Sequence, residues 1–296
     1  MKSVMLAGLV LGAMTAVNCV TGGASSPVSV PEIEGVFPFK VGQFEVFMLV
    51  EAERDGNTGI LIGVDEAVLS RYIPADGFRH TANAFLIKAA GQNILIDTGT
   101  GAGGIIVDTI KKLGVEPEQI NAVLITHLHG DHFGSLQIDG TATFPNAKVF
   151  VSANELEFFT QNNVNQGAVA ALAPYGTNVV SFTPGELGST ISEILPGIYP
   201  IAAYGHTPGH TIFLIQNSDE KFLVFGDLLH VALVQFALPE ISATFDVDAN
   251  AAAVTRRQVL DYAAGNNIPI GGIHIVYPGV GTVEVEGEGF KFTPAK

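Results

Sequence analysis

The apolar positions of this chain fall into short runs separated by polar, glycine-rich stretches, and most runs have the length of a β-strand. Residues 43–50 alternate and then become fully apolar, as a strand does when it enters a core. Two apolar runs within residues 83–99 are joined by AAGQN, which predicts a hairpin. Further buried strands are expected at 121–127, 147–152, 197–206, 211–216, 221–227 and 270–276, with a last hairpin at 281–292.

Helical spacing of apolar residues marks other segments. Residues 102–114 and 249–265 each carry this spacing and end on a glycine, which is a helix stop. Ser152 and Glu155 predict a capping box for a helix near 153–161, and a short helix is expected near Asp65–Arg71. Strands followed by helices occur in two halves without a repeat of solenoid length. The sequence therefore predicts an α/β protein in which two sheets pack together with helices outside.

The N-terminus has the pattern of an export signal. Lys2 precedes an uncharged stretch from Ser3 to Val30 whose apolar core is short for a membrane-spanning helix. We expect a signal peptide and linker over residues 1–24, one domain over 25–296, and a periplasmic or extracellular location. Cys19 is the only cysteine, which excludes disulfides and cysteine-bound zinc after it. The sequence leaves open whether Cys19 carries a lipid anchor. Without such an anchor, no membrane association is expected.

Charge narrows the choice of partners. The net charge is −15 and only 14 lysines and arginines are spread over 296 residues, which argues against nucleic acid. The same acidity disfavours anionic membrane surfaces. We therefore expect a small-molecule partner, and the composition leaves a homodimer open.

The stretch THLHGDH, residues 126–132, gathers three of the eight histidines directly after an apolar run. A loop held by the end of a buried strand is a common place for functional groups. Imidazole and carboxylate together are ligands for zinc and similar divalent metals. His127 and His129 could share one ion, and Asp131 and His132, after a turn at Gly130, could serve a second.

Two metals need more ligands than these four. The chain offers His206, Asp227 and His274, each at or near the end of a predicted strand. Each alone is weak evidence, but together with the 126–132 motif they predict a binuclear site built on strand ends.

These segments carry a family resemblance. THLHGDH, GHTPGHT at 205–211, FGD at 225–227 and the late His274 resemble the metallo-β-lactamase superfamily from about residue 43 onward. The segments at 227–240 and 273–294 are similar to the methyl parathion hydrolase branch, which is related to lactonases and aryl esterases. The resemblance implies a four-layer αββα sandwich.

The resemblance also implies residue roles. One metal would bind His127, His129 and His206, the second would bind Asp131, His132 and His274, and Asp227 would bridge both. His210 and Asp97 would support the site without binding metal. Zinc is the first expectation, and manganese, cobalt and iron accept the same ligands.

In such a site, a hydroxide held between the metals would attack the substrate, and Asp131 or a nearby histidine would carry a proton. The sequence contains no Gly-x-Ser-x-Gly elbow, so it does not indicate a serine nucleophile. His230 stands where related lactonases often have a tyrosine, and an imidazole can donate a hydrogen bond to a carbonyl or leaving group. We therefore expect lactones, aryl esters or related esters as substrates, with organophosphate triesters as further candidates.

Alternatives remain at this point. Export would suit a β-lactam hydrolase, and a non-catalytic metal-binding surface protein could keep the fold. Nuclease, glutathione thioesterase and flavodiiron-like roles fit less well. His80 is expected to be an ordinary residue, and one or two of five phenylalanines are expected to face the pocket: Phe85, Phe133, Phe158, Phe159 and Phe236.

Overall fold

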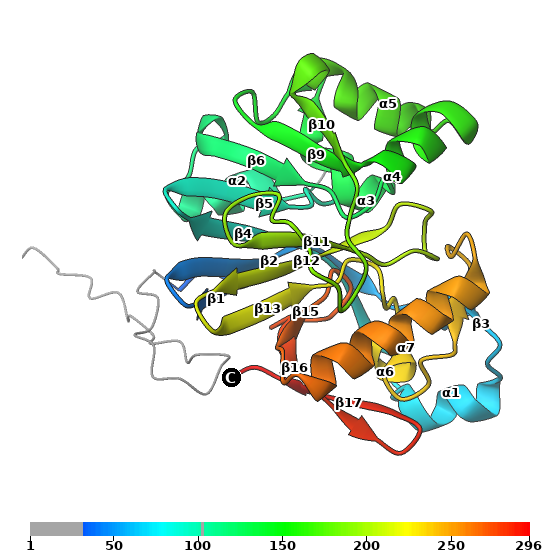
Figure 1. The fold of residues 1–296 in the computed structure, drawn as a ribbon. Helices are drawn as coiled ribbons and strands as arrows, with labels where there is room; N and C mark the ends of the chain where they lie inside the picture. The colour runs from blue at the N-terminus through cyan, green and yellow to red at the C-terminus, as the bar shows by residue number, and fades with distance from the viewer. Residues whose placement is uncertain (1–31, 102–103) are drawn as a thin grey trace, which may run out of the picture.

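The computed structural model describes residues 32–101 and 104–296 and contains two large sheets that face each other (Figure 1). The first sheet has the strand order β1 (Val36–Val41), β2 (Phe44–Asp55), β4 (Arg79–Ala89), β5 (Gln92–Ile96), β6 (Ile120–Leu124), β9 (Lys148–Ser152) and β10 (Val179–Phe182). The second has the order β11 (Ile198–Ala202), β12 (Thr211–Asn217), β13 (Glu220–Val224), β15 (Ile270–Gly271), β16 (Val280–Glu286) and β17 (Gly289–Pro294). Two small ribbons pair β3 (Leu61–Ile62) with β14 (Ser242–Ala243) and β7 (Gln137–Ile138) with β8 (Thr141–Ala142).

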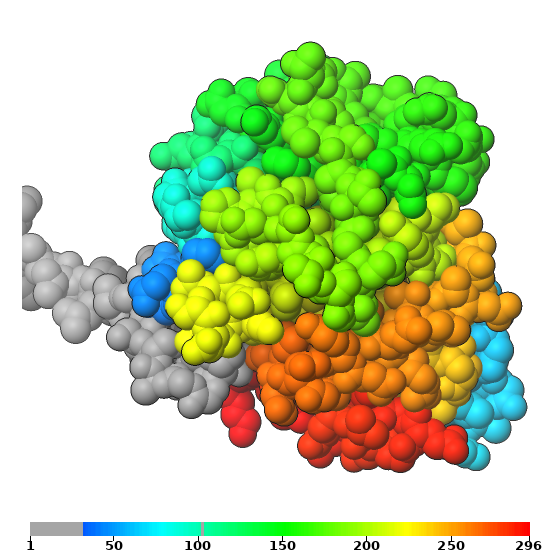
Figure 2. All heavy atoms as spheres, in the orientation of Figure 1, coloured from blue at the N-terminus to red at the C-terminus, as the bar shows by residue number. Residues whose placement is uncertain are grey.

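Helices cover the outer faces of both sheets. Beside the first sheet lie α2 (Ile106–Lys112), α3 (Gly130–Phe133), α4 (Ala153–Glu157) and α5 (Gln166–Leu172). On the side of the second sheet lie α1 (Glu66–Tyr72), α6 (Ala232–Gln235) and the long α7 (Ala249–Gly265). The space-filling view shows the same division, with α7 and the β16–β17 hairpin together on the surface of the second half (Figure 2).

Alternation along β2 shows how the layers form. Phe47 and Leu49 pack on one face with the residues of α2 and α5, whereas Val46 and Met48 face the second sheet. Beyond the second sheet, Val259 and the rest of the buried face of α7 form a third apolar cluster. Successive side chains of a strand point to opposite faces, so a strand covered on both sides is apolar throughout. The four-layer αββα prediction is confirmed.

The predicted elements agree with the structure to different degrees. Helix α7 spans the predicted residues 249–265, and the β4–β5 hairpin turns at Ala90 and Gly91, both of which have positive φ. The strand predicted at 270–276 is wrong in length, since β15 contains only two residues and His274 lies in the loop after it. The predicted signal segment and Cys19 lie outside the described residues. Among those described, no helix is both long and apolar enough to cross a bilayer.

The topology brings the predicted ligands to one edge. Strands β5, β6 and β9 run parallel, as do β13 and β15, so their carboxyl ends point the same way within each sheet. Asp97, His127, Asp227 and His274 follow β5, β6, β13 and β15 respectively. Loops from both sheets therefore meet where the two sheets end.

Candidate metal centre

Three histidines form one half of the site. His127 and His129 lie in the loop after β6, and His206 lies in the loop after β11. His127 Nε2 is 3.0 Å from His129 Nδ1, and His206 Nε2 is 3.1 Å from each of these nitrogens. Nitrogens at zinc-ligand distance and tetrahedral angles would be about 3.3 Å apart. The three nitrogens thus have the spacing of a single metal site.

The second half contains Asp131, His132 and His274. The Asp131 carboxylate lies 3.7 Å from His132 Nε2 and 3.6 Å from His274 Nε2. Helix α3 carries Asp131 and His132 as successive residues, and the loop after β15 carries His274. These three residues form a second group able to hold a metal ion.

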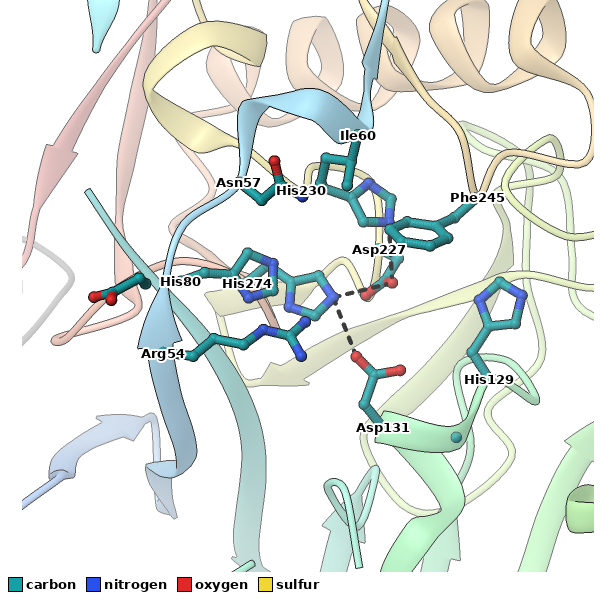
Figure 3. Close-up of a pocket in the computed structure, with 12 residues that line it drawn as sticks. Arg54, Asn57, Ile60, His80, His129, Asp131, Asp227, His230, Phe245 and His274 are labelled. Atoms are coloured by element: carbon teal, nitrogen blue, oxygen red, sulfur yellow. Dashed lines mark hydrogen bonds and ion pairs between the residues drawn. The ribbon is translucent and has the colours of Figure 1, made fainter. Parts of the chain in front are cut away.

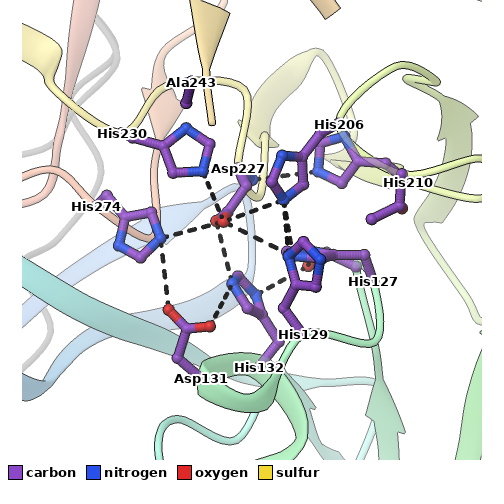
Figure 4. Close-up of polar contacts among 12 residues, drawn as sticks. His127, His129, Asp131, His132, His206, His210, Asp227, His230, Ala243 and His274 are labelled. Carbon is purple, nitrogen blue, oxygen red and sulfur yellow. Dashed lines mark hydrogen bonds and ion pairs between the residues drawn. The ribbon is translucent and has the colours of Figure 1, made fainter. Parts of the chain in front are cut away.

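Asp227 lies between the two halves (Figure 4). Its Oδ1 is 3.1 Å from His132 Nε2, and its Oδ2 is 3.1 Å from His274 Nε2. The same Oδ2 is 3.4 Å from His206 Nε2 and 3.7 Å from His127 Nε2. All seven predicted ligands converge, with Asp227 in the bridging position.

The donor atoms at the centre of the site fit divalent metals. His132 Nε2 and Asp227 Oδ1 are buried and lie 3.1 Å apart, but neither meets hydrogen-bond geometry with any described residue, although buried polar atoms almost always do. His206 Nδ1 bonds Asp246, which leaves the Nε2 lone pair directed at two other imidazole nitrogens. Lone pairs in such proximity repel one another unless a cation lies between them. The site therefore has the donor set and the unmet charge that divalent ions would satisfy.

Asp97 supports the loop after β6 and belongs to neither metal group, as predicted. Its carboxylate accepts from Thr126 N at 2.8 Å and Thr126 Oγ1 at 2.7 Å. It also bonds His132 Nδ1 at 2.8 Å, which leaves Nε2 free to face the site. Asp97 is fully buried and has φ +58°, so the hydrogen bonds keep it in a conformation that aspartate tolerates better than most residues.

His210 is a supporting residue and belongs to neither metal group. Its Nδ1 donates to Ala203 O at 2.9 Å, and its Nε2 accepts from Asp227 N at 3.1 Å. Both ring nitrogens are therefore used, and the imidazole fixes the backbone of the bridging aspartate. Gly226 allows this approach, because a Cβ there would lie 2.4 Å from His210 Nε2.

Sequence reasoning missed Asp246. This carboxylate bonds His206 Nδ1 at 2.9 Å, accepts from Ala243 N at 2.8 Å and lies 3.6 Å from the buried Arg256. A carboxylate behind a metal-binding histidine fixes its tautomer and orientation. Forty residues separate His206 from Asp246, so no local spacing could have found the pair.

The predicted capping box at Ser152 is only half present. Ser152 Oγ accepts from Glu155 N at 3.3 Å, as an N-cap should. However, the Glu155 carboxylate turns into the protein, where it accepts from Leu128 N at 2.8 Å, Thr207 Oγ1 at 2.7 Å and Gly209 N at 2.9 Å. It thus joins the loop of His127 and His129 to the loop of His206. Burial raises the pKa of Glu155 to about 7.

His80, which was expected to be an ordinary residue, borders the site. Strand β4 begins four residues before the predicted hairpin, and it places His80 against His274 with ring centroids 4.4 Å apart. The next residue, Thr81, accepts a hydrogen bond from His274 Nδ1 at 2.7 Å through its backbone oxygen. Burial, with the neighbouring charge of His274, lowers the pKa of His80 to about 3, so its ring is neutral near pH 7.

A pocket of about 670 Å³ opens onto the metal groups (Figure 3). None of the five predicted phenylalanines lines it, but Phe236 lines a neighbouring pocket that also reaches His230 and His274. Phe159 contacts His129 from outside the pocket, with ring centroids 5.6 Å apart, and Phe85 is fully buried in the core between the sheets. Phe245, which the sequence did not suggest, supplies the aromatic wall. The lining residues are Arg54, Asp55, Asn57, Ile60, His80, His129, Gly130, Asp131, Asp227, His230, Phe245 and His274.

His230 points into this pocket, as predicted for a substrate-facing group. It is buried, its Nε2 lies 3.3 Å from Asp227 Oδ2, and neither ring nitrogen has a hydrogen-bond partner among the described residues. Its backbone is fixed, because Gln235 Oε1 accepts from both His230 N and Val231 N. The ring is therefore held at the metal groups, with Nε2 beside Asp227 and Nδ1 without a partner among the described residues.

The two halves of the site differ in electrostatics. Burial holds the pKa of His127 well below its usual value and lowers that of His206 to about 3. Burial opposes the charged form of His132 too, but nearby carboxylates, Asp227 first, raise its pKa well above the usual value. His274 behaves in the same way, with its pKa raised mainly by Asp227. The charges on His132 and His274 in turn hold the pKa of Asp227 well below the usual value against its burial.

Comparison with known proteins agrees with this geometry. The family model described as the metallo-beta-lactamase superfamily matches residues 77–267. The chain belongs to the metallo-beta-lactamase superfamily. Its members are metal-dependent hydrolases, and the family-level assignment made from the HxHxDH motif is confirmed.

Solved members of the superfamily share the whole fold. The hydrolase AbOPH is 26% identical with a TM-score of 0.80, and the alignment covers 90% of this chain and 99% of that one. AidC, described as a dizinc quorum-quenching lactonase in complex with a homoserine product, is 25% identical with a TM-score of 0.76, over 88% and 98% of the two chains. A hydrolase and a lactonase are thus among the solved structures to which this chain is similar.

Curated relatives match over shorter stretches. An N-acyl homoserine lactonase from a Bacillus species is 30% identical over 112 residues, which are 38% of this chain and 39% of that protein. The uncharacterized protein YobT of Bacillus subtilis is 31% identical over 152 residues, 49% of this chain and 60% of that protein. The chain thus spans less than two thirds of the length of these relatives.

Proposed function

We propose that this chain is a binuclear metal-dependent hydrolase of lactones and aryl esters, with zinc as its metal. The observation that carries the proposal is the convergence of five imidazoles and two carboxylates, from loops of both sheets, beside an open pocket. His127, His129 and His206 would hold one ion, Asp131, His132 and His274 the other, and Asp227 both. Bound there, two divalent ions would lower the pKa of a water and polarise the substrate carbonyl.

Side chains of the protein would supply the remaining steps. Asp131 is partly exposed at the pocket floor, so its carboxylate can take up a proton and pass it to solvent. His230 can donate a hydrogen bond to the carbonyl or leaving oxygen, because its Nδ1 has no partner among the described residues. Ile60 and Phe245 give the pocket apolar walls that limit the access of water.

A lactone substrate is favoured by two observations. His230 gives the pocket a hydrogen-bond donor for a carbonyl, which a purely apolar organophosphate pocket lacks. The similarity to AidC and to an N-acyl homoserine lactonase supports the same class. Organophosphate triesters remain candidate secondary substrates.

The test is a substrate panel on the metal-loaded protein, with and without a chelator. It contains a simple lactone, an acyl-homoserine lactone, an aryl ester, a methyl phosphotriester and a chromogenic cephalosporin. We expect chelator-sensitive turnover of the lactones and the aryl ester. Turnover of the cephalosporin alone would replace the proposal with β-lactam hydrolysis, and no turnover with metals bound would indicate a non-catalytic protein.

His230→Leu tests the assignment of the donor. Removing a hydrogen bond to the reacting oxygen should lower lactone turnover roughly tenfold and raise the ratio of phosphotriester to lactone turnover. Metal content is the control, since His230 also lies within ligand distance of Asp227 and His274. Loss of a metal ion in the variant would instead make His230 a ligand, and an unchanged ratio with full metal content would remove it from the mechanism.

We also propose that the protein is exported. The support is the N-terminal pattern of Lys2 followed by an uncharged apolar stretch. Fractionation of expressing cells, with mass spectrometry of the mature N-terminus, should show cleavage after this stretch.

A further inference from the structure

Arg54 lies on the pocket wall near the end of β2. Its Cα partner across the sheet is His80 on β4, so the two side chains share a face. His80 stacks on His274, whose Nε2 is 3.1 Å from the bridging Asp227. Figure 3 shows the Arg54 guanidinium directed into the pocket beside His274 and Asp131. Only two stacked imidazoles therefore separate the position of Arg54 from the bridging carboxylate.

The acidic neighbours of Arg54 are already paired with another cation. Glu53 and Asp55 precede and follow it, and although Asp55 at the end of the strand also borders the pocket, alternation along β2 directs both side chains to the other face. There they meet Arg79, whose Nε is 2.6 Å from Glu53 Oε1 and whose Nη1 bonds Asp55. Arg54 itself has no hydrogen bond or ion pair with any residue that the structure describes.

The pocket offers Arg54 no other anion. Its remaining carboxylates are Asp131 and Asp227, and both belong to the metal groups. Two divalent ions held there would outweigh the charge of these two carboxylates, and the pocket would then carry a surplus of positive charge, although the chain as a whole has a net charge of −15. An arginine fork that faces such a pocket matches the geometry of a planar carboxylate.

We propose that Arg54 forms an anion subsite that selects lactones or esters bearing a carboxylate next to the scissile group. The inference rests on the proposed function and specifies its substrate class. One end of the substrate would face the metals and His230, and its carboxylate would bind the guanidinium on the wall formed by β2 and β4. The local charge would also steer anionic substrates to a protein that otherwise repels them.

The experiment compares two matched lactones: a γ-butyrolactone with a carboxylate on its γ carbon, and the corresponding carboxamide. Hydrolysis is followed by proton release for the metal-loaded wild type and for Arg54→Ala, Arg54→Lys and Arg71→Ala. Arg71 lies in the last turn of α1, away from the pocket lining, and its loss changes the net charge equally. Metal content of every variant is measured in parallel.

We expect the wild type to prefer the carboxylate lactone. Arg54→Ala should raise the KM for that substrate about ten- to hundredfold, the range for a lost charge-assisted hydrogen bond, and should change the KM for the carboxamide less than about twofold. Arg54→Lys should retain part of the preference for the carboxylate lactone, and Arg71→Ala should retain all of it. Added salt should reduce this preference in the wild type.

The outcomes separate the two proposals. The anion subsite would be overturned if Arg54→Ala raised the KM equally for both lactones, or if the wild type did not prefer the carboxylate lactone. Either result would leave the hydrolase proposal intact. Absence of turnover for both lactones in the metal-loaded wild type would instead overturn the proposed function.

Discussion

At the scale of single residues, Glu155 shows how a buried charge can organise a site that it does not enter. Its carboxylate is fully buried and accepts hydrogen bonds from Leu128 N, Thr207 Oγ1 and Gly209 N. Leu128 lies between His127 and His129, and Thr207 follows His206. The two loops that carry the three-histidine group are therefore held in register by one side chain.

We predict that Glu155→Ala weakens metal binding by the three-histidine group about ten- to hundredfold, the usual effect of removing a supporting hydrogen-bond partner. Glu155→Gln should recover part of the loss, because its amide oxygen can still accept from one loop. The measurement is a competitive chelator titration that resolves two binding constants.

Tyr175→Phe is the matched control for Glu155. The Tyr175 hydroxyl is also buried and joins two segments, donating to Leu136 O at 2.7 Å and accepting from Phe144 N at 3.3 Å. This variant should lose stability without weakening the three-histidine group selectively. If Glu155→Ala lowered both metal affinities equally, or neither, Glu155 would be a purely structural residue.

At the scale of elements, Gly205 sets the distance between the His206 loop and helix α7. It has φ +129°, and a Cβ at this position would lie 2.2 Å from Ala252 N in the helix backbone. Neither the conformation nor the contact accommodates a side chain. We predict that Gly205→Ala costs about 2–4 kcal/mol of unfolding free energy, since strain and overpacking add.

Urea unfolding measures this cost, and Gly265→Ala at the end of the same helix is the control. A Cβ at Gly265 meets nothing within 4 Å, so this substitution should be neutral or slightly stabilising. Similar stability for both variants would show that α7 can shift, and that Gly205 does not fix the loop.

The elements also show what the sequence could and could not reveal. The 126–132 motif and the strand ends indicated seven residues whose side chains the structure brings together, because a metal site favours histidine and aspartate at the ends of buried strands. Phe245, Asp246 and the role of His80 depend on how distant segments pack, and no local pattern encodes that. β15 was overestimated because Ile273 and Ile275 are buried and apolar yet lie outside the strand.

At the scale of the whole molecule, loops from two sheets create two metal groups with unequal proton affinity. Acidic neighbours raise the pKa of His132 and His274, whereas burial lowers the pKa of His127, His129 and His206. A histidine must lose its proton to bind a metal, so metal and proton compete more strongly in the group of Asp131, His132 and His274.

We therefore predict that acidification releases the metal of this second group first. As pH falls, the histidines with raised pKa take up protons at higher pH than the three with lowered pKa. Single-group variants make the order measurable: His274→Ala retains the three-histidine group, and His129→Ala retains the second. Equilibrium dialysis between about pH 8 and about pH 5 should show that His274→Ala loses half of its bound metal at a lower pH than His129→Ala does. The reverse order would mean that the carboxylates beside His132 and His274 favour the metal ion more than they favour the proton.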